Sequence, residues 1–270
     1  MIIQNFSSKS TVEPFLDPNE VVALMFDQMD TVMVGVEEFF PNDTESDLLK
    51  LNGVDYQRDN PVYRTAVRLL LNHFNWDIGS LITSIEAKSL DVVFNECSIT
   101  NPRAYYLSVL SQDPSTIDHL NGTEKEACSI MTECDENTKS HDLVRIQPCF
   151  HPFCIGCLTS YVTIMVNDNQ FLVGRIPCPQ AGCKVIIDDS TVISLLCNEG
   201  DDGNSESEAA LSKYHRFIGS KFVESNKYLT NCPTPDCTKV AQIVDDLNTE
   251  AIECPDCLAL FCFTCGSNWH

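Results

Sequence analysis

Cysteines and histidines in the second half of the chain recur at the short spacings that metal ligands use. The pairs are Cys149-x-His151, Cys154-x-x-Cys157, Cys178-x4-Cys183, Cys232-x4-Cys237, Cys254-x-x-Cys257 and Cys262-x-x-Cys265-x4-His270. Tetrahedral Zn²⁺ binds four thiolate or imidazole groups, and a turn that carries two of them supplies half of a site. The repeated pairs therefore predict a fold that depends on bound zinc.

A disulfide scaffold is the alternative for a chain with 15 cysteines. It would leave one cysteine unpaired, because the count is odd, and it would not explain the positions of His151 and His270. The amino terminus has no basic segment followed by an apolar stretch of signal-peptide length. We therefore expect reduced thiols and a cytoplasmic or nuclear protein, or one found in both places.

The net charge of -22 limits the class of partner, with 17 basic against 39 acidic residues. Nucleic-acid binding needs a basic surface for the phosphates, and this chain is acidic in its zinc-binding half as well as in its first half. No apolar run reaches the length that spans a membrane. We expect protein partners, with no nucleic acid and no membrane.

The first half of the chain predicts a bundle of helices. Asp17, Pro18 and Glu20 form a helix-start signal, and Asn60-Pro61 forms another. Apolar residues at helical spacing follow both signals, and two further helices are expected at about 77–86 and 88–97. The first 16 residues are polar and without periodicity, so they are expected to be flexible. Three turn signals in residues 98–123 predict a linker.

The ligand spacings predict how the zinc sites are built. One residue separates Cys149 from His151, so this pair forms a different turn from Cys154-x-x-Cys157, and the two pairs are expected to serve different ions. The first ion would be bound by Cys149, His151, Cys178 and Cys183, and the second by Cys154 and Cys157 with upstream ligands. Farther along, Cys232, Cys237, Cys254 and Cys257 form a sequential set of four, and Cys262, Cys265 and His270 form a set of three. Three to four Zn²⁺ ions are expected in total.

Cys197 lies outside every ligand pair. The segment that holds it, VISLLC, is apolar, and no histidine or basic residue lies nearby in sequence to lower the pKa of its thiol. We expect a buried structural thiol and predict no catalytic residue in this chain.

Five segments of the chain resemble the ariadne branch of the RING, in-between-RING, RING ubiquitin ligases. They are LLNHFNWD (70–77), FNECSITNP (94–102), CFHPFCIGC (149–157), VESNKYLTNCPTPDC (223–237) and FCFTCGSNWH (261–270). The resemblance implies that the helical bundle is a ubiquitin-associated-like domain and that the first RING docks a ubiquitin-conjugating enzyme. It also implies ubiquitin as a partner, and a cullin-linked ubiquitin-like modifier as a possible partner of the bundle.

The resemblance implies an α-rich α+β multidomain chain, with a cross-brace RING and a partial in-between-RING zinc module after the helical bundle. The expected parts are a flexible N-terminus (1–16), the ubiquitin-associated-like domain (17–97), a linker (98–123), the first RING (124–195), an acidic loop (196–208), a linker helix (209–228) and an incomplete in-between-RING domain (229–270).

The chain departs from the family pattern at the first pair of RING ligands. The pattern has C-x-x-C, but here Met131 stands three residues after Cys128, and a thioether binds Zn²⁺ poorly compared with a thiolate. We expect Cys134 to supply the missing ligand through a longer loop. Otherwise this site has three ligands or is empty.

The resemblance also assigns a docking surface. Ile130 and the turn at Pro179, one from each zinc loop, would contact the conjugating enzyme; the alternative is that both residues only pack the loops.

The family carries its catalytic cysteine in a second RING, and the sequence ends at His270 before such a domain. The chain alone is expected to form no ubiquitin thioester. Two functions remain open: a ubiquitin ligase of which this chain is the docking part, or a non-catalytic zinc adaptor that binds the conjugating enzyme. Whether the end at His270 is biological or reflects an incomplete sequence stays open too.

Overall fold

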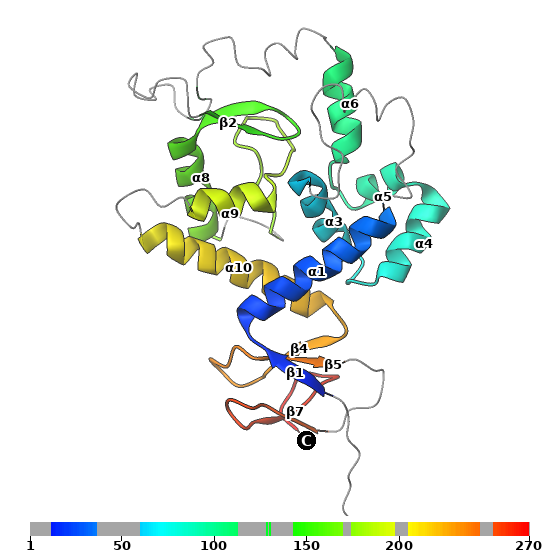
Figure 1. The fold of residues 1–270 in the computed structure, drawn as a ribbon, viewed down its shortest axis with the longest axis vertical. Coiled ribbons are helices and arrows are strands. Elements are labelled where there is room, and N and C mark those ends of the chain that lie inside the picture. The colour runs from blue at the N-terminus through cyan, green and yellow to red at the C-terminus, as the bar shows by residue number, and fades with distance from the viewer. Residues whose placement is uncertain are drawn as a thin grey trace, which may run out of the picture.

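The computed structural model describes residues 12–36, 60–112, 128, 130, 143–169, 174–197, 205–243 and 251–269. Helices and strands are mixed in an α+β fold, and Figure 1 shows a larger body of helices above a small module of strands. Helices α1 (Pro18–Val36) and α10 (Ser205–Ser225) pack against each other between the two parts. Among the described residues, none of the helices combines the length and the apolar character that a membrane span requires.

The helices of the first half begin where their capping residues predict. Asp17 accepts hydrogen bonds from the backbone N–H groups of Asn19 and Glu20, and Glu20 accepts one from the N–H of Asp17. Asn60 caps α3 (Pro61–His73) through the N–H of Val62. Asp77 caps α4 (Ile78–Lys88), and α5 (Leu90–Glu96) follows. The four helices predicted here are confirmed.

The segment predicted as a linker contains a further helix, α6 (Pro102–Gln112). Pro102 begins this helix, a position where the missing N–H of proline costs no hydrogen bond. Asn101-Pro102 was therefore a helix start rather than a turn. The hydroxyl group of the buried Tyr106 donates a hydrogen bond to Gln147 Oε1 over 2.7 Å, and the Tyr106 ring lies 5.9 Å from that of Phe150.

A hairpin and two helices form the middle of the chain. Strands β2 (Leu143–Ile146) and β3 (His151–Cys154) pair antiparallel, and α8 (Ile155–Asn167) follows directly. Helix α9 (Asp189–Cys197) precedes α10, and both pack on α8. The last residues of the predicted acidic loop, 205–208, belong to α10; the part at 198–204 lies outside the described residues.

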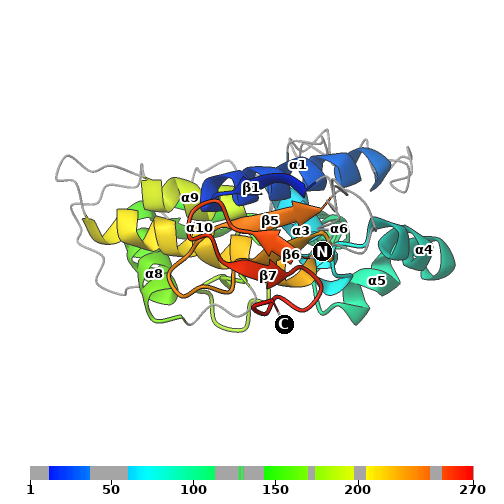
Figure 2. The same cartoon turned by 90° about the horizontal axis from the view of Figure 1, so that it is seen from below.

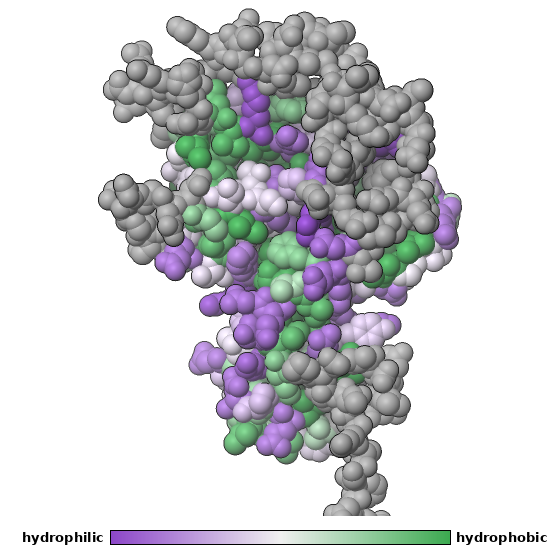
Figure 3. Space-filling model, viewed as in Figure 1, coloured by the Kyte–Doolittle hydropathy of each residue, from purple (hydrophilic) through white to green (hydrophobic). Residues whose placement is uncertain are grey.

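A small module, here called the C-terminal module (residues 229–243 and 251–269), follows α10. It contains β4 (Leu229–Asn231), β5 (Val240–Ile243), β6 (Ala251–Glu253) and β7 (Leu260–Cys262). Strands β6 and β7 form a hairpin, and β4 and β5 belong to a three-stranded sheet of order β1-β5-β4. Polar and apolar residues are interspersed over this module on the face that Figure 3 shows.

The third strand of that sheet, β1 (Val12–Leu16), corrects a prediction. The first 16 residues were expected to be flexible, yet residues 12–16 pair with β5, more than half of the chain away. The hydrogen-bonding partners that order this segment are distant in sequence, so local polarity and periodicity could not reveal them. Residues 1–11 lie outside the described residues.

One continuous core joins the helices of the first half to the middle of the chain. It includes Met25 of α1, Leu70 of α3, Leu158 of α8 and Tyr214 of α10, each at most 2% exposed. The C-terminal module has a much smaller core of its own, made of Cys232, Ala241, Ile243, Ile252, Cys254 and Phe261. A core of six residues is too small to stabilise a module without a further cross-link.

Candidate metal centres

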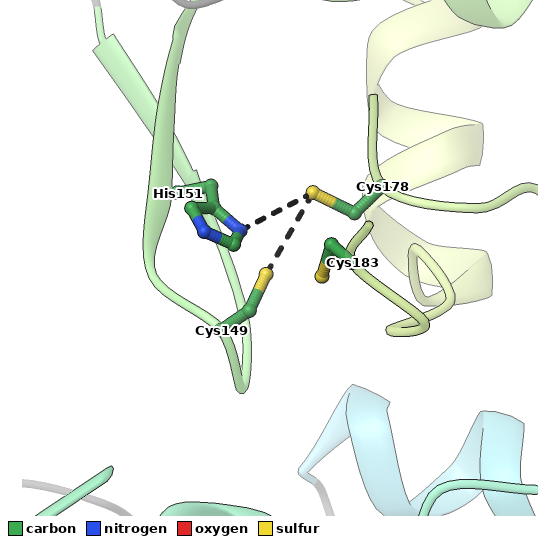
Figure 4. A group of neighbouring side chains, drawn as sticks. All are labelled: Cys149, His151, Cys178 and Cys183. Atoms are coloured by element: carbon green, nitrogen blue, oxygen red, sulfur yellow. Dashed lines mark hydrogen bonds between the residues drawn. The ribbon is translucent and has the colours of Figure 1, made fainter. Parts of the chain in front are cut away.

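Four predicted ligands meet beside the β2–β3 hairpin. The ligand atoms of Cys149, His151, Cys178 and Cys183 all lie within 4.8 Å of one another. Cys149 and His151 come from the end of the hairpin, and Cys178 and Cys183 come from the loop that precedes α9, as Figure 4 shows. Gly182, with φ of 78°, allows the tight turn between the two cysteines of this loop.

Hydrogen bonds between the ligand atoms show how closely this first cluster converges. Cys149 Sγ donates to Cys178 Sγ over 3.8 Å, and Cys178 Sγ lies 3.6 Å from His151 Nδ1 (Figure 4). The Cys149 thiol lowers the pKa of Cys178 to about 6, and the same contact raises the pKa of Cys149. Zn²⁺ would take the place of these shared protons, and three sulfur atoms with one imidazole are a donor set that suits it.

A second cluster joins Cys128 to Cys154 and Cys157, again with ligand atoms within 4.8 Å. Cys154 is the N-cap residue of α8, and its Sγ accepts a hydrogen bond from the N–H of Cys157 over 3.4 Å. The start of α8 thus aims both sulfur atoms at Cys128. Cys134, the predicted fourth ligand, and Met131 lie outside the described residues.

The first two clusters take their members alternately along the chain. Cys128 belongs to the second cluster, Cys149 and His151 to the first, Cys154 and Cys157 to the second, and Cys178 and Cys183 to the first. The first set is the one that the spacings predict. In the second set, Cys154 and Cys157 are the predicted pair, and Cys128 is the upstream ligand that the family resemblance implies. Each ion would therefore join segments that lie on either side of a ligand pair of the other ion, and together the two ions would tie the chain from Cys128 to Cys183 into one unit.

The third cluster lies in the C-terminal module. Cys232 and Cys237 flank the turn between β4 and β5, and Cys254 and Cys257 follow β6. Cys232 Sγ lies 3.5 Å from Cys257 Sγ, and Cys237 Sγ lies 3.7 Å from Cys254 Sγ. A hydrogen bond with the Thr234 hydroxyl lowers the pKa of Cys257 to about 6. Four sulfur atoms in this arrangement fit one structural Zn²⁺.

Two of the three remaining predicted ligands share a turn after β7. The backbone N–H of Gly266 donates to the carbonyl of Cys262 over 2.9 Å, and Gly266 has φ of 63°. Hydrogen bonds from the backbone of Cys265 lower the pKa of Cys262. His270 lies outside the described residues.

The other residues singled out in the sequence have clear positions. Ile130 and Pro179 are both half-buried, and Ile130 packs against the main core. Cys197 is exposed, which corrects the prediction that it is buried. It is the last residue of α9, where the apolar face of the helix no longer covers its side chain.

Sequence reasoning missed a buried polar network between the helical half and α9. Arg68 of α3 forms two hydrogen bonds of 2.7 Å with the carboxylate of Asp189, and both side chains are at most 5% exposed. Tyr214 donates its hydroxyl proton to the same carboxylate, and Thr65 accepts a bond from the N–H of Asp189. Burial raises the pKa of Tyr214 well above its usual value. No local pattern pairs residues 121 positions apart.

Comparison with known proteins gives a matching domain family and several similar proteins. Residues 212–270 match the family model of the IBR domain, a half RING-finger domain, which begins within α10 upstream of the boundary predicted at residue 229. The chain is 32% identical over 208 residues to the E3 ubiquitin-protein ligase arih1l of Danio rerio, covering 76% of this chain and 34% of that protein.

Two further E3 ubiquitin-protein ligases are similar to this chain over nearly the same length. The E3 ubiquitin-protein ligase ARIH1 of Homo sapiens is 31% identical over 206 residues, covering 76% of this chain and 33% of that protein. The E3 ubiquitin-protein ligase ariadne-1 of Drosophila melanogaster is 28% identical over 205 residues, covering 76% of this chain and 36% of that protein. The chain thus spans about a third of the length of these relatives. With its IBR match and its zinc-binding cysteine clusters, it belongs to the ariadne-type family of RING, in-between-RING, RING ubiquitin ligases.

Proposed function

We propose that this chain acts in protein ubiquitination as the part of a ubiquitin ligase that docks a ubiquitin-conjugating enzyme. The observation that carries the proposal is the pair of interleaved clusters. Because their members alternate, zinc at both sites holds the loop at Ile130 and the loop at Pro179 on one rigid unit. The relatives named above are ubiquitin-protein ligases, and they supply the class of reaction.

The residues proposed as zinc ligands are those of the three clusters, with Cys134 as the fourth ligand of the second. Cys262, Cys265 and His270 are proposed as ligands of a further ion. Each ion would supply a structural cross-link, since every donor in the three clusters is a sulfur atom or an imidazole nitrogen. The conjugating enzyme would contact protein side chains around these sites.

The helical half has a proposed role of its own. Helices α1, α3, α4 and α5 would form the ubiquitin-associated-like domain, with a cullin-linked ubiquitin-like modifier as a candidate partner. This half shares one core with the middle of the chain, so a partner bound to it would stabilise the arrangement of the RING loops.

Replacing Ile130 by alanine is expected to weaken binding of a ubiquitin-loaded conjugating enzyme by about tenfold, the loss typical of an apolar interface anchor worth above 1 kcal/mol. Binding would be followed by calorimetry on the full chain. Val92→Ala is the matched control: it removes methyl groups from an exposed side chain of α5, a helix that holds none of the proposed zinc ligands, and should leave affinity unchanged. Wild-type affinity in Ile130→Ala with unchanged zinc content would assign Ile130 to loop packing instead.

A transfer assay with the same ubiquitin-loaded conjugating enzyme tests whether this chain carries transfer chemistry itself. Both functions need docking, but only a chain with a nucleophilic cysteine can carry a ubiquitin adduct that thiols reverse. Outside the three clusters and the Cys262–Cys265 turn, the described cysteines are Cys97, which is buried, and Cys197, which is exposed. We expect no adduct on this chain alone. An adduct lost in Cys197→Ser would place transfer chemistry on this residue and contradict the docking-only account.

A further inference from the structure

The N-terminal strand closes an open edge of the C-terminal module. Strand β5 lies in the middle of its sheet, with β4 on one side and β1 on the other, and both pairings are antiparallel. Figure 2 shows β1 beside β5. Val240, Ala241 and Ile243 of β5 are buried. Without β1, this packed strand would present a row of backbone groups with no strand beside them, which is the template that another extended segment can pair with.

The sequence of β1 suits an outer strand. Its register pairs Val12 with Ile243, Glu13 with Gln242 and Leu16 with Val240, with an irregularity between Glu13 and Leu16. Pro14 lies within that irregularity. A proline has no N–H to donate, so within sheets it is confined to edges and bulges. Strand β1 therefore ends the sheet and does not extend it further.

An aromatic side chain fixes β1 to the second hairpin of the module. The Phe15 ring lies 6.3 Å from that of Phe261 in β7, at an edge-to-face angle of 74°. Phe261 is fully buried, and Phe15 packs against the same small core. The strand thus contacts both hairpins, β5 through its backbone and β7 through Phe15.

Helix α1, which follows β1, packs against α10 and the residue after it. Only Asp17 separates β1 from α1, and the capping hydrogen bonds at Asp17 stiffen this connection. Helix α1 approaches α10 closely at Gly219, where a Cβ atom would lie 3.4 Å from Val22. Gln28 accepts a hydrogen bond from Asn226, the buried residue after α10, over 3.3 Å. Strand β1 and helix α1 together bridge the joint between α10 and the C-terminal module.

We propose that the outer edge of β5, with the ring of Phe261 beside it, is a binding site for an extended peptide, and that residues 12–16 are its ligand within the chain. Backbone pairing supplies affinity in this mode of recognition, and a pocket for one side chain, here that of Phe15, supplies specificity. The tether keeps the ligand at a high effective concentration, so the bound strand clasps the C-terminal module to α1 and α10. The proposal does not depend on the proposed ubiquitin function.

The proposal is tested by removing strand β1 from the chain and adding it back as a separate peptide. In a released variant of the full chain, residues 12–16 are replaced by Gly-Ser-Gly-Ser-Gly, and a fluorescent peptide of residues 10–18 is added and followed by anisotropy. Saturable binding to the released variant is expected. Binding to the wild-type chain should be at least about tenfold weaker, because its own strand occupies the edge. A peptide with Phe15→Ala should bind the released variant at least about tenfold more weakly than the unmodified peptide does.

Hydrogen exchange locates the binding. The amides of Val240 and Gln242 alternate with those that bond β4, so they should exchange faster in the released variant and regain protection when the peptide is added. Phe26→Ala in the otherwise wild-type chain is the matched control, since Phe26 is a half-buried phenylalanine of α1 that lies against Arg64 instead. It should leave the amides of Val240 and Gln242 protected.

Three results would overturn the proposal: no peptide binding to a released variant that keeps its zinc, equal binding to both chains, or unchanged protection of Val240 and Gln242. If the replacement lowers zinc content, Phe15→Ala in the full chain takes its place. That variant must then show faster exchange at Val240 and Gln242 than Phe26→Ala does, and equal exchange would count against the site.

Discussion

Replacing Cys254 by alanine is expected to unfold the C-terminal module while the rest of the chain stays folded. Cys254 is fully buried in the third cluster and also belongs to the six-residue core of this module. A structural zinc site contributes about 10–16 kcal/mol of binding free energy, which the small core cannot replace. Native mass spectrometry should show the loss of the zinc ion of the third cluster, together with any ion bound at Cys262 and Cys265 in the same module. Hydrogen exchange should show loss of protection in residues 229–243 and 251–262.

Cys197→Ala is the control for this experiment. It is the same substitution at an exposed cysteine outside the clusters, and both zinc content and exchange should match the wild-type chain. Protection should persist in α8 and α9 of the Cys254→Ala chain, because these helices belong to the larger core. If the Cys254→Ala chain kept its full zinc content and a protected β6–β7 hairpin, the third cluster would not be a structural zinc site.

Replacing Arg68 by methionine is expected to destabilise the larger body by about 3–5 kcal/mol, the cost of leaving one partner of a buried ion pair without the other. The carboxylate of Asp189 would stay buried, with the hydroxyl group of Tyr214 as a remaining hydrogen-bond donor. Urea unfolding in zinc-containing buffer measures the change through the transition midpoint. Adding Asp189→Asn should recover part of the loss, because no uncompensated charge then remains and asparagine can still accept the Tyr214 proton.

Arg64→Met tests whether burial is the cause. Arg64 lies on the same helix and pairs with Asp30 over 2.9 Å, but the two side chains are 27% and 46% exposed. An exposed pair contributes about 0–1 kcal/mol, so this variant should unfold close to the wild-type midpoint. Two results would contradict this explanation. One is equal destabilisation by Arg64→Met and Arg68→Met, and the other is a double variant, Arg68→Met with Asp189→Asn, that is no more stable than Arg68→Met alone. Either would show that the unpaired buried charge does not cause the loss of stability.

The sequence predicts those parts of the fold that depend on neighbours along the chain. Capping at Asp17, Asn60 and Asp77 is local, and each predicted helix start was confirmed. The ligand turns are local too, because a metal ligand pair needs only the residues between its members. The sets that meet in space, such as Cys149 with Cys178, followed from spacing together with the coordination number of zinc.

The parts that the sequence did not reveal depend on partners far along the chain. The sequence of β1 predicts a flexible segment, because the strand that orders it, β5, lies far along the chain. The sequence around Arg68 likewise gives no indication that this side chain pairs with Asp189. Cys197 looked buried because its segment is apolar, but it ends its helix. Local propensity carries no information on such contacts, which only the packed structure defines.

Native mass spectrometry of the purified full chain, with thiol counting under denaturing conditions, tests whether bound zinc holds this fold together. We expect three or four bound Zn²⁺ ions, free thiols only, and the loss of one ion in Cys134→Ala but none in Cys197→Ala. A chain that contains no zinc, or whose cysteines are joined in disulfides, would contradict this expectation.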